Sequence, residues 1–185
     1  MLVLASASPR RQELLRNAGI AFVARPTDIP ETPNKDEAPR AFAERMAREK
    51  ALAAFGRQPK DFVLGADTIV VVDSEILGKP RNSTDAVRML RSLSGRTHQV
   101  MTGVCLLGYE FEDVRSETTT VTMTALSEDD IHSYISSGEP MDKAGAYAIQ
   151  GRASRWISRI EGDYFNVVGL PVSLVYRMMQ EHGVL

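Results

Sequence analysis

Three scarcities in the sequence exclude whole classes of protein. Only one of the 185 residues, Cys105, is a cysteine, so no internal disulfide can form and the chain fits a reducing compartment. No apolar run approaches the ~18 residues that a membrane helix needs, and residues 1–7 lack the basic region and the apolar length of an export signal. A basic excess is also missing. The formal net charge of −2 argues against a general nucleic-acid or membrane-surface binder.

These absences together predict a cytoplasmic protein. Lysine is scarce as well, with five lysines against 17 arginines. A lysine in apolar or glycine-rich surroundings is therefore a candidate site residue. Cys105 falls in a predicted strand, where a buried core thiol is expected rather than a reactive one. The three histidines, His98, His132 and His182, show no metal-ligand spacing, and we expect structural or exposed roles for them.

What is present is an ordinary globular composition, with 43% hydrophobic and 25% charged residues, and a length that suits one domain spanning residues 1–185. Hydrophobic periodicity and turn residues predict the elements. Strands are expected at residues 2–5, 20–25, 62–73, 98–107, 114–123, 144–149 and 154–160, and helices at 9–17, 40–55, 83–93, 127–136 and 170–180. Gly56 is expected to stop the second helix, and Ser83 to cap the third. Four prolines mark residues 26–39 as an exposed loop. This order predicts a mixed α/β sheet, not a strictly doubly wound one.

Asp67 is a carboxylate inside an apolar segment. Residues 63–66 before it and 69–72 after it are apolar or small. An unpaired charge in such surroundings costs several kcal/mol, so the carboxylate indicates a bound partner. The alternative is an aspartate at a strand end that makes a turn hydrogen bond.

Lys50 lies near the middle of an apolar arc on the helix predicted at residues 40–55, which advances ~100° per residue. The arc comprises Phe42, Ala43, Met46, Ala47, Ala53 and Ala54. Two interpretations stay open. Lys50 either snorkels, with a buried stem and a solvated ammonium, or serves a site.

Residues 6–11, Ser-Ala-Ser-Pro-Arg-Arg, form the turn from the first strand into the first helix. A helix start offers free N–H groups and the positive end of a dipole to an anion. Arginine adds bidentate donors suited to phosphate. Ser8, Arg10 and Arg11 are therefore phosphate-binding candidates, the alternative being a helix cap followed by solvated arginines.

Two further lysines stand beside glycines. Gly78-Lys79-Pro80 is not a P-loop, because the upstream glycine is missing and Pro80 replaces Ser or Thr. Lys143 precedes Gly145 among small residues, which let a ligand approach the backbone. Glu31, in the proline-rich loop, would by itself be taken as a solvated carboxylate.

In this order the pieces resemble one family, the Maf family. The resemblance covers almost the whole chain and rests on residues 6–11, Glu31, Lys50-Ala51, Ala66-Asp67-Thr68, Gly78-Lys79-Pro80, Ser137-Gly138-Glu139-Pro140, residues 142–147, Ile149-Gln150-Gly151 and residues 166–171. It implies a fold similar to inosine triphosphate pyrophosphatases: an elongated mixed sheet flanked by helices, with two lobes around a cleft.

The activity that the resemblance implies is hydrolysis of a nucleoside triphosphate between the α and β phosphates, with a divalent cation, Mg²⁺ or Mn²⁺. Thr68 and Gln150 resemble the branch that acts on dTTP and UTP, since the branch acting on 7-methyl-GTP differs at both. Pro30 stands where an acidic residue is frequent, which leaves open a second loop carboxylate. We expect a housecleaning role in the nucleotide pool.

The resemblance also implies roles. Glu31 and Asp67 would hold the metal, and Asp67 would act as the base for the attacking water. Lys50, Lys79, Arg11 and the Ser8 turn would neutralise the phosphates. Arg10, Thr68 and Gln150 would read the base, and Lys143 would bind substrate.

The only partner implied is the nucleotide, with neither nucleic acid nor membrane, and a homodimer is allowed. Two alternatives stay open. One is a nucleotide-sensing regulator linked to cell-division arrest, and the other is a hydrolase of modified pyrimidine nucleotides.

Overall fold

The computed structural model describes residues 1–55 and 61–185, so the stop expected at Gly56 lies outside the described residues. These residues contain seven strands, six α-helices and three short 3₁₀ helices. The strands are β1 (Leu2–Leu4), β2 (Val23–Ala24), β3 (Phe62–Val72), β4 (Glu75–Leu77), β5 (Thr97–Leu107), β6 (Glu112–Met123) and β7 (Ile157–Glu161). The helices are α1 (Pro9–Asn17), α2 (Pro39–Phe55), α3 (Ser83–Leu93), α4 (Glu128–Ser136), α5 (Tyr164–Val168), α6 (Val172–Glu181), η1 (Glu139–Asp142), η2 (Ala144–Ala146) and η3 (Arg152–Trp156).

The strands form one sheet in the order β2-β1-β3-β5-β6-β7, with β4 paired to β3. Strand β1 runs parallel to β2 and β3, whereas β4 is antiparallel to β3 and β7 is antiparallel to β6. The predicted mixed α/β sheet is therefore confirmed. The cleft between lobes stays a prediction.

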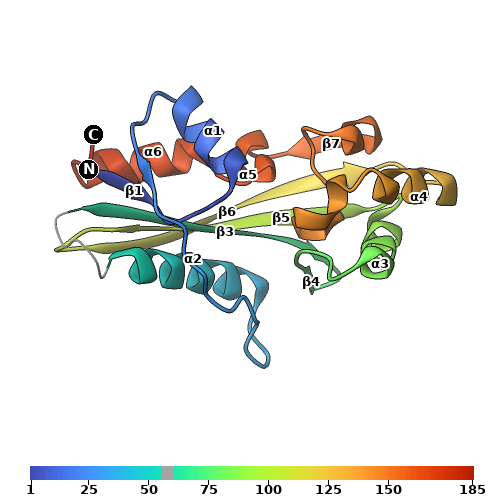
Figure 1. Ribbon diagram of the computed structural model, residues 1–185, viewed down its shortest axis with the longest axis horizontal. Coiled ribbons are helices and arrows are strands. Elements are labelled where there is room, and N and C mark those ends of the chain that lie inside the picture. Colours follow the sequence, from blue (N-terminus) through green and yellow to red (C-terminus); the bar gives the residue numbers. More distant parts are fainter. Residues whose placement is uncertain (56–60) are drawn as a thin grey trace. The chain divides into compact units, whose positions relative to one another are not determined.

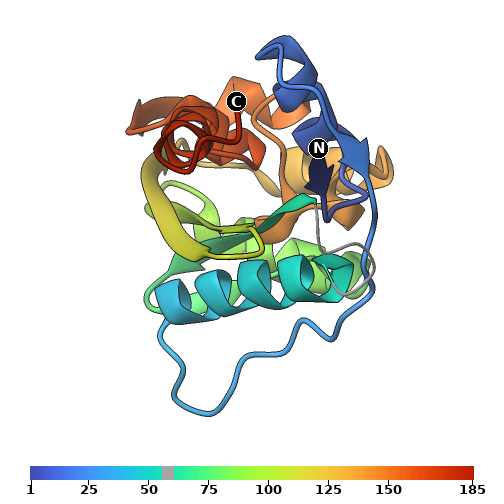
Figure 2. The same cartoon turned by 90° about the vertical axis from the view of Figure 1, so that its left-hand side faces the viewer.

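The chain divides into two compact units, each with its own core. Unit 1 comprises residues 1–68, 102–117 and 169–185. In this unit α2 covers one face of the strands, and α1 and α6 cover the other (Figures 1 and 2). Its core includes a cluster of small and branched side chains, Val3, Ala5, Ala47, Ala51, Ala54, Val63, Cys105 and Leu107.

Unit 2 comprises residues 69–101 and 118–168. Strands β4 and β7, helices α3 to α5 and the three 3₁₀ helices belong to it. Its core is built around large side chains, among them Leu90, Val100, Met123, Tyr134 and Trp156.

The apolar periodicity located most elements to within a residue or two. Helix α1 has the predicted bounds and is capped by Ser8, whose side chain accepts a hydrogen bond from the Arg11 N–H. Helix α4 begins with the capping box of Ser127 and Asp130. The cap of α3, however, is Asn82 and not Ser83, because the Asn82 side chain accepts from the Asp85 N–H. An Asn carbonyl one residue earlier is an equally good cap.

The strand predicted at residues 144–149 is wrong. Residues Ala144–Ala146 form the 3₁₀ helix η2, because Gly145 and Ala146 adopt φ values of +68° and +61°. These left-handed conformations are incompatible with a strand. Gly145 also packs so closely on Val70 that an added Cβ would lie 2.8 Å from that side chain. The short elements β4 and α5 were not predicted.

The buried polar groups have the structural character expected of them. Cys105 is fully buried, and burial raises the pKa of its thiol to about 12, so the thiol stays protonated at neutral pH. His98 is buried beside Tyr147, at 2.7 Å from its hydroxyl. Burial lowers the pKa of His98 to about 4.

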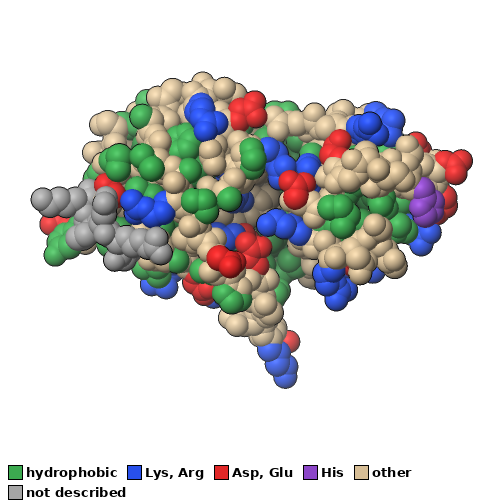
Figure 3. Space-filling model, in the orientation of Figure 1, with side chains coloured by type: hydrophobic (Ala, Val, Ile, Leu, Met, Phe, Trp, Pro, Cys, Tyr) green, Lys and Arg blue, Asp and Glu red, His purple; other side chains and the backbone are tan. Residues whose placement is uncertain are grey.

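The surface reflects the nearly balanced charge. Figure 3 shows acidic and basic side chains interspersed on the face drawn there. Among the described residues, no helix is both long enough and apolar enough to cross a bilayer.

Candidate active site

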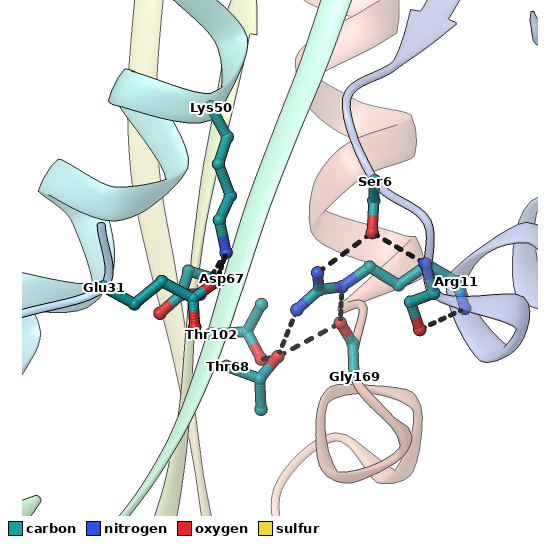
Figure 4. Close-up of polar contacts among 9 residues, drawn as sticks. Ser6, Arg11, Glu31, Lys50, Asp67, Thr68, Thr102 and Gly169 are labelled. Carbon is teal, nitrogen blue, oxygen red and sulfur yellow. Dashed lines mark hydrogen bonds and ion pairs between the residues drawn. The ribbon is translucent and has the colours of Figure 1, made fainter. Parts of the chain in front are cut away.

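The ammonium of Lys50 binds two carboxylates in unit 1. Lys50 Nζ lies 2.6 Å from Glu31 Oε1 and 2.6 Å from Asp67 Oδ1. Lys50 and Asp67 are buried, whereas Glu31 is exposed. The ammonium therefore does not snorkel into water, and both of the charges that stood out in the sequence are explained by one cluster (Figure 4).

Glycines bring α2 close enough to form this cluster. Gly65 and Asp67 lie two residues apart on β3 and so face the same side of the sheet. A Cβ on Gly65 would lie 2.1 Å from the Ala47 carbonyl oxygen of α2. Gly103 of β5 is equally tight, with a Cβ position 2.2 Å from the Ala43 carbonyl oxygen. Only glycine permits this approach, which brings Lys50 within reach of Asp67.

The proline-rich loop reaches Lys50 because it is tied to α2. The loop runs from β2 down beside α2 before the helix begins (Figure 2). Arg45 of α2 binds Glu37 at 2.6 Å, and its NH2 group donates to the Thr32 carbonyl oxygen at 3.1 Å. The hydrogen bond from Arg45 lowers the pKa of Glu37 to about 2. Glu31 lies one residue before Thr32, whose carbonyl oxygen accepts the Arg45 hydrogen bond.

The serine turn lies at the carboxyl end of β1. Because β1 and β3 are parallel, with Leu4 opposite Leu64, the turn after β1 lies beside the middle of β3. Ser6 Oγ accepts the Ser8 N–H at 3.2 Å. Carboxyl ends of parallel strands are where open α/β sheets commonly bind ligands.

Arg11 is a branched link between three parts of unit 1. Its guanidinium donates to the Gly169 carbonyl oxygen at 2.8 Å, to Thr68 Oγ1 at 3.0 Å and to Ser6 Oγ at 3.3 Å. Burial lowers the pKa of Arg11, while the charges of Asp67 and Glu31 oppose this shift. Three of its five N–H donors are thus used internally.

Thr68 faces the side of β3 opposite to Asp67, as alternation along a strand requires. Its hydroxyl lies 2.9 Å from Thr102 Oγ1 and 3.2 Å from the Gly169 carbonyl oxygen. Figure 4 shows the two polar clusters on the two sides of β3. Thr102 was not anticipated, because one threonine in a strand carries no distinctive signal.

The predicted site residues divide between the units. Unit 1 holds Ser8, Arg10, Arg11, Glu31, Lys50, Asp67 and Thr68, and unit 2 holds Lys79, Lys143 and Gln150. Arg10 is half-buried on α1, while Lys79 and Gln150 are exposed. Lys143 Nζ binds Asp142 Oδ1 at 2.6 Å and the Glu139 carbonyl oxygen at 2.8 Å. The catalytic and binding roles of all ten residues stay predictions.

The described residues contain no group of three or more His, Cys, Asp or Glu side chains placed to hold a metal ion. Glu31 and Asp67 nevertheless converge on one cation position, since both bind the same ammonium. Mg²⁺ commonly takes one or two protein carboxylates and completes its shell with water and substrate phosphates. These two hard oxygen donors therefore fit a divalent ion whose remaining ligands come from water and a substrate.

These features define a class: a mixed α/β protein whose carboxylates, lysine and serine turn gather around the parallel strands β1 and β3, an arrangement suited to a phosphate-bearing ligand. The family comparison is more specific. The model of the family described as Maf-like protein matches residues 1–182, and the chain belongs to this family.

Two relatives are similar to this chain along nearly their whole length. A dTTP/UTP pyrophosphatase of Koribacter versatilis (strain Ellin345) is 58% identical over 184 residues, covering 100% of this chain and 95% of the relative. A dTTP/UTP pyrophosphatase of Symbiobacterium thermophilum is 52% identical over 182 residues, covering 98% of this chain and 94% of the relative. A solved structure, the Staphylococcus aureus Ham1 protein, is 16% identical and covers 66% of this chain and 71% of its own, with a TM-score of 0.48.

Proposed function

We propose that the protein is a nucleoside triphosphate pyrophosphatase that hydrolyses dTTP and UTP to the monophosphate and pyrophosphate. Membership of the Maf-like family and the names of relatives at 58% and 52% identity support this function. The structural observation that carries it is the Lys50 ammonium held between the Glu31 and Asp67 carboxylates.

Charge balance explains why this cluster suits a triphosphate. Lys50 alone cannot neutralise Glu31, Asp67 and a substrate that brings about four negative charges. A divalent ion held by the two carboxylates would supply the missing positive charge and stabilise charge that develops in the transition state. Glu31 and Asp67 are the residues that would hold it. Lys50 would orient both carboxylates and donate to a phosphate oxygen.

Asp67 is the candidate general base. Among the described residues only Lys50 donates a hydrogen bond to this carboxylate, on Oδ1, so Oδ2 is available to a water molecule. The Lys50 contact fixes the orientation of the carboxylate, and general-base catalysis depends on that orientation. A carboxylate held by a cation is a weak base, so electrostatic stabilisation would supply much of the rate.

We propose that Arg10, Thr68 and Gln150 recognise the base of the nucleotide. A Gln amide can donate to the 4-carbonyl and accept from the 3-N–H of uracil or thymine. The same amide, rotated, matches cytosine, so Gln150 alone cannot reject CTP. Arg10 only donates and would favour a carbonyl over the amine of cytosine.

We further propose that the enzyme acts on free nucleotides in the cytoplasm, in keeping with its single cysteine and its net charge of −2. The physiological substrate on this proposal is a standard pyrimidine triphosphate, and modified pyrimidine nucleotides are the competing substrates.

A nucleotide panel tests the proposal. Purified protein with Mg²⁺ should release pyrophosphate, not orthophosphate, from dTTP and UTP faster than from CTP, ATP or GTP. Binding without turnover would indicate a nucleotide sensor instead, and faster hydrolysis of a modified pyrimidine nucleotide would change the substrate.

A further inference from the structure

Gln150 occupies the corner of a clamped β-turn in unit 2. The turn spans residues 148–151 and is closed by a hydrogen bond from the Gly151 N–H to the Ala148 carbonyl oxygen at 3.1 Å. Within it the Ile149 side chain is buried and Gln150 is exposed. An exposed side chain on an immobilised corner is well suited to recognise a ligand.

Two side chains outside the turn hold both of its ends. The Tyr134 hydroxyl accepts the Ala148 N–H at 3.2 Å and donates to Glu139 Oε1 at 2.9 Å. The same Glu139 oxygen accepts the Arg152 N–H at 3.1 Å, just beyond the turn. The Tyr134 hydroxyl thus binds the backbone before Gln150, and the Glu139 carboxylate binds the backbone after it.

The side chains that hold the turn are tightly packed. Tyr134 is fully buried and packs edge-to-face on Trp156, with ring centroids 5.4 Å apart. Gly151 lies against the Glu139 carboxylate, and a Cβ there would come within 1.9 Å of Oε1. The backbone of the turn therefore packs directly on the Glu139 carboxylate, and its hydrogen bonds resist a shift away.

We propose that Tyr134 and Glu139 are positioning residues that set the selection of uracil and thymine by holding the Gln150 turn. This inference rests on the proposed function, in which Gln150 reads the base. Selection between an amine and a carbonyl depends on hydrogen-bond geometry. The Gln150 amide by itself can rotate to match cytosine, and the clamped turn would hold it in the orientation that matches uracil and thymine. A turn freed from Tyr134 would lose that constraint.

The primary test is Tyr134→Phe, which removes the hydroxyl and keeps the ring. The ratio of kcat/KM for UTP over CTP should fall about tenfold, the scale of one lost hydrogen bond. The change should appear in KM more than in kcat, and the Mg²⁺ concentration for half-maximal activity should stay unchanged.

A matched control is Tyr147→Phe. Tyr147 is also buried in unit 2, but its hydroxyl bonds His98 of β5 and not the turn. This variant should keep the wild-type UTP-to-CTP ratio. A similar fall of the ratio in both variants would mean a general loss of packing and would overturn the inference.

Two more variants keep the test decisive. Glu139→Gln, which replaces the carboxylate by an amide, should lower the ratio in the same direction if Tyr134→Phe fails to fold. In a Gln150→Ala background, Tyr134→Phe should change the ratio no further, because the residue being positioned is already gone. Full additivity of the two changes would refute the positioning role.

The failures are distinguishable. A wild-type protein that releases no pyrophosphate from UTP or dTTP refutes the proposed function and the inference together. A wild-type protein that prefers UTP, with an unchanged ratio in folded Tyr134→Phe and Glu139→Gln, refutes the inference alone.

Discussion

Lys50 of α2 and Asp67 of β3 are joined by a 2.6 Å ion pair in which both side chains are buried. The pair exists because Gly65 lets the helix backbone come close to the strand. Glu31 adds a second carboxylate to the same ammonium from a loop.

Asp67→Asn should fold and lose at least ~100-fold in turnover, the usual scale for removing an acid–base group. The amide keeps the shape of the side chain, and Lys50 keeps Glu31 as a charged partner, so stability should fall by only about 1–3 kcal/mol. Steady-state kinetics and urea unfolding measure the two effects.

Asp85→Asn is the matched control for Asp67. Asp85 of unit 2 is buried, but its carboxylate accepts hydrogen bonds from the Arg81 N–H at 3.1 Å and from Arg88 Nε at 3.0 Å. It should lose stability and keep turnover. Near-wild-type turnover in folded Asp67→Asn would refute the assignment of the base.

Metal removal tests the two-carboxylate site. Excess EDTA should abolish pyrophosphate release, and Mg²⁺ or Mn²⁺ should restore it. Glu31→Gln should raise the metal concentration needed for half-maximal rate by about tenfold or more. Asp36→Asn, at an exposed carboxylate in the same loop, should leave that concentration unchanged. Full activity in chelator would show that the carboxylates serve another purpose.

Base choice should depend on Arg10. Wild-type protein should prefer dTTP and UTP, because a site that leaves a polar group unpaired can reject a substrate by a factor on the order of 10⁴. Arg10→Ala should narrow the UTP-to-CTP gap more than it changes the metal requirement. Arg16→Ala is the control, since Arg16 is exposed on the same helix and bonds Gln12. An unchanged ratio in Arg10→Ala would contradict this account.

His98 should make the protein less stable in acid. Its pKa in the folded state is about 4, below the usual 6.5. The unfolded chain therefore takes up a proton between pH 6.5 and 4 while the folded one does not. The contribution of His98 to the free energy of unfolding is complete above pH 6.5. It is lost as the pH falls toward 4, and the loss reaches about 3 kcal/mol.

Urea unfolding at pH 7 and pH 4.5 measures this loss. His98→Gln, which keeps a polar group near Tyr147 but cannot titrate, should show a smaller fall in unfolding free energy than wild type. His132→Gln, at an exposed position on α4, should behave as wild type. An equal fall in unfolding free energy between pH 7 and pH 4.5 for wild type and His98→Gln would refute the role of His98.

Local chemistry determined many elements. Ser8 and Pro9 define the start of α1, Ser127 and Asp130 cap α4, and the valine-rich run forms β3. Each signal acts within one turn or one strand, so it can be recognised without the rest of the chain. Where tertiary packing dominates, local patterns gave a wrong prediction. The strand expected at residues 144–149 begins instead with a 3₁₀ helix, in which Gly145 packs on Val70.

For the site, the sequence by itself singled out Asp67 and Lys50, because a charge among apolar residues needs a partner. It could not determine which partner. Lys50 is 17 residues from Asp67 and 19 from Glu31, and Arg11 is 158 residues from Gly169. Such contacts depend on how closely α2 packs on its glycines and on where the Arg45-anchored loop runs. Hydrogen-bond geometry of that kind is decided by tertiary packing, since no local pattern encodes a distance between segments remote along the chain.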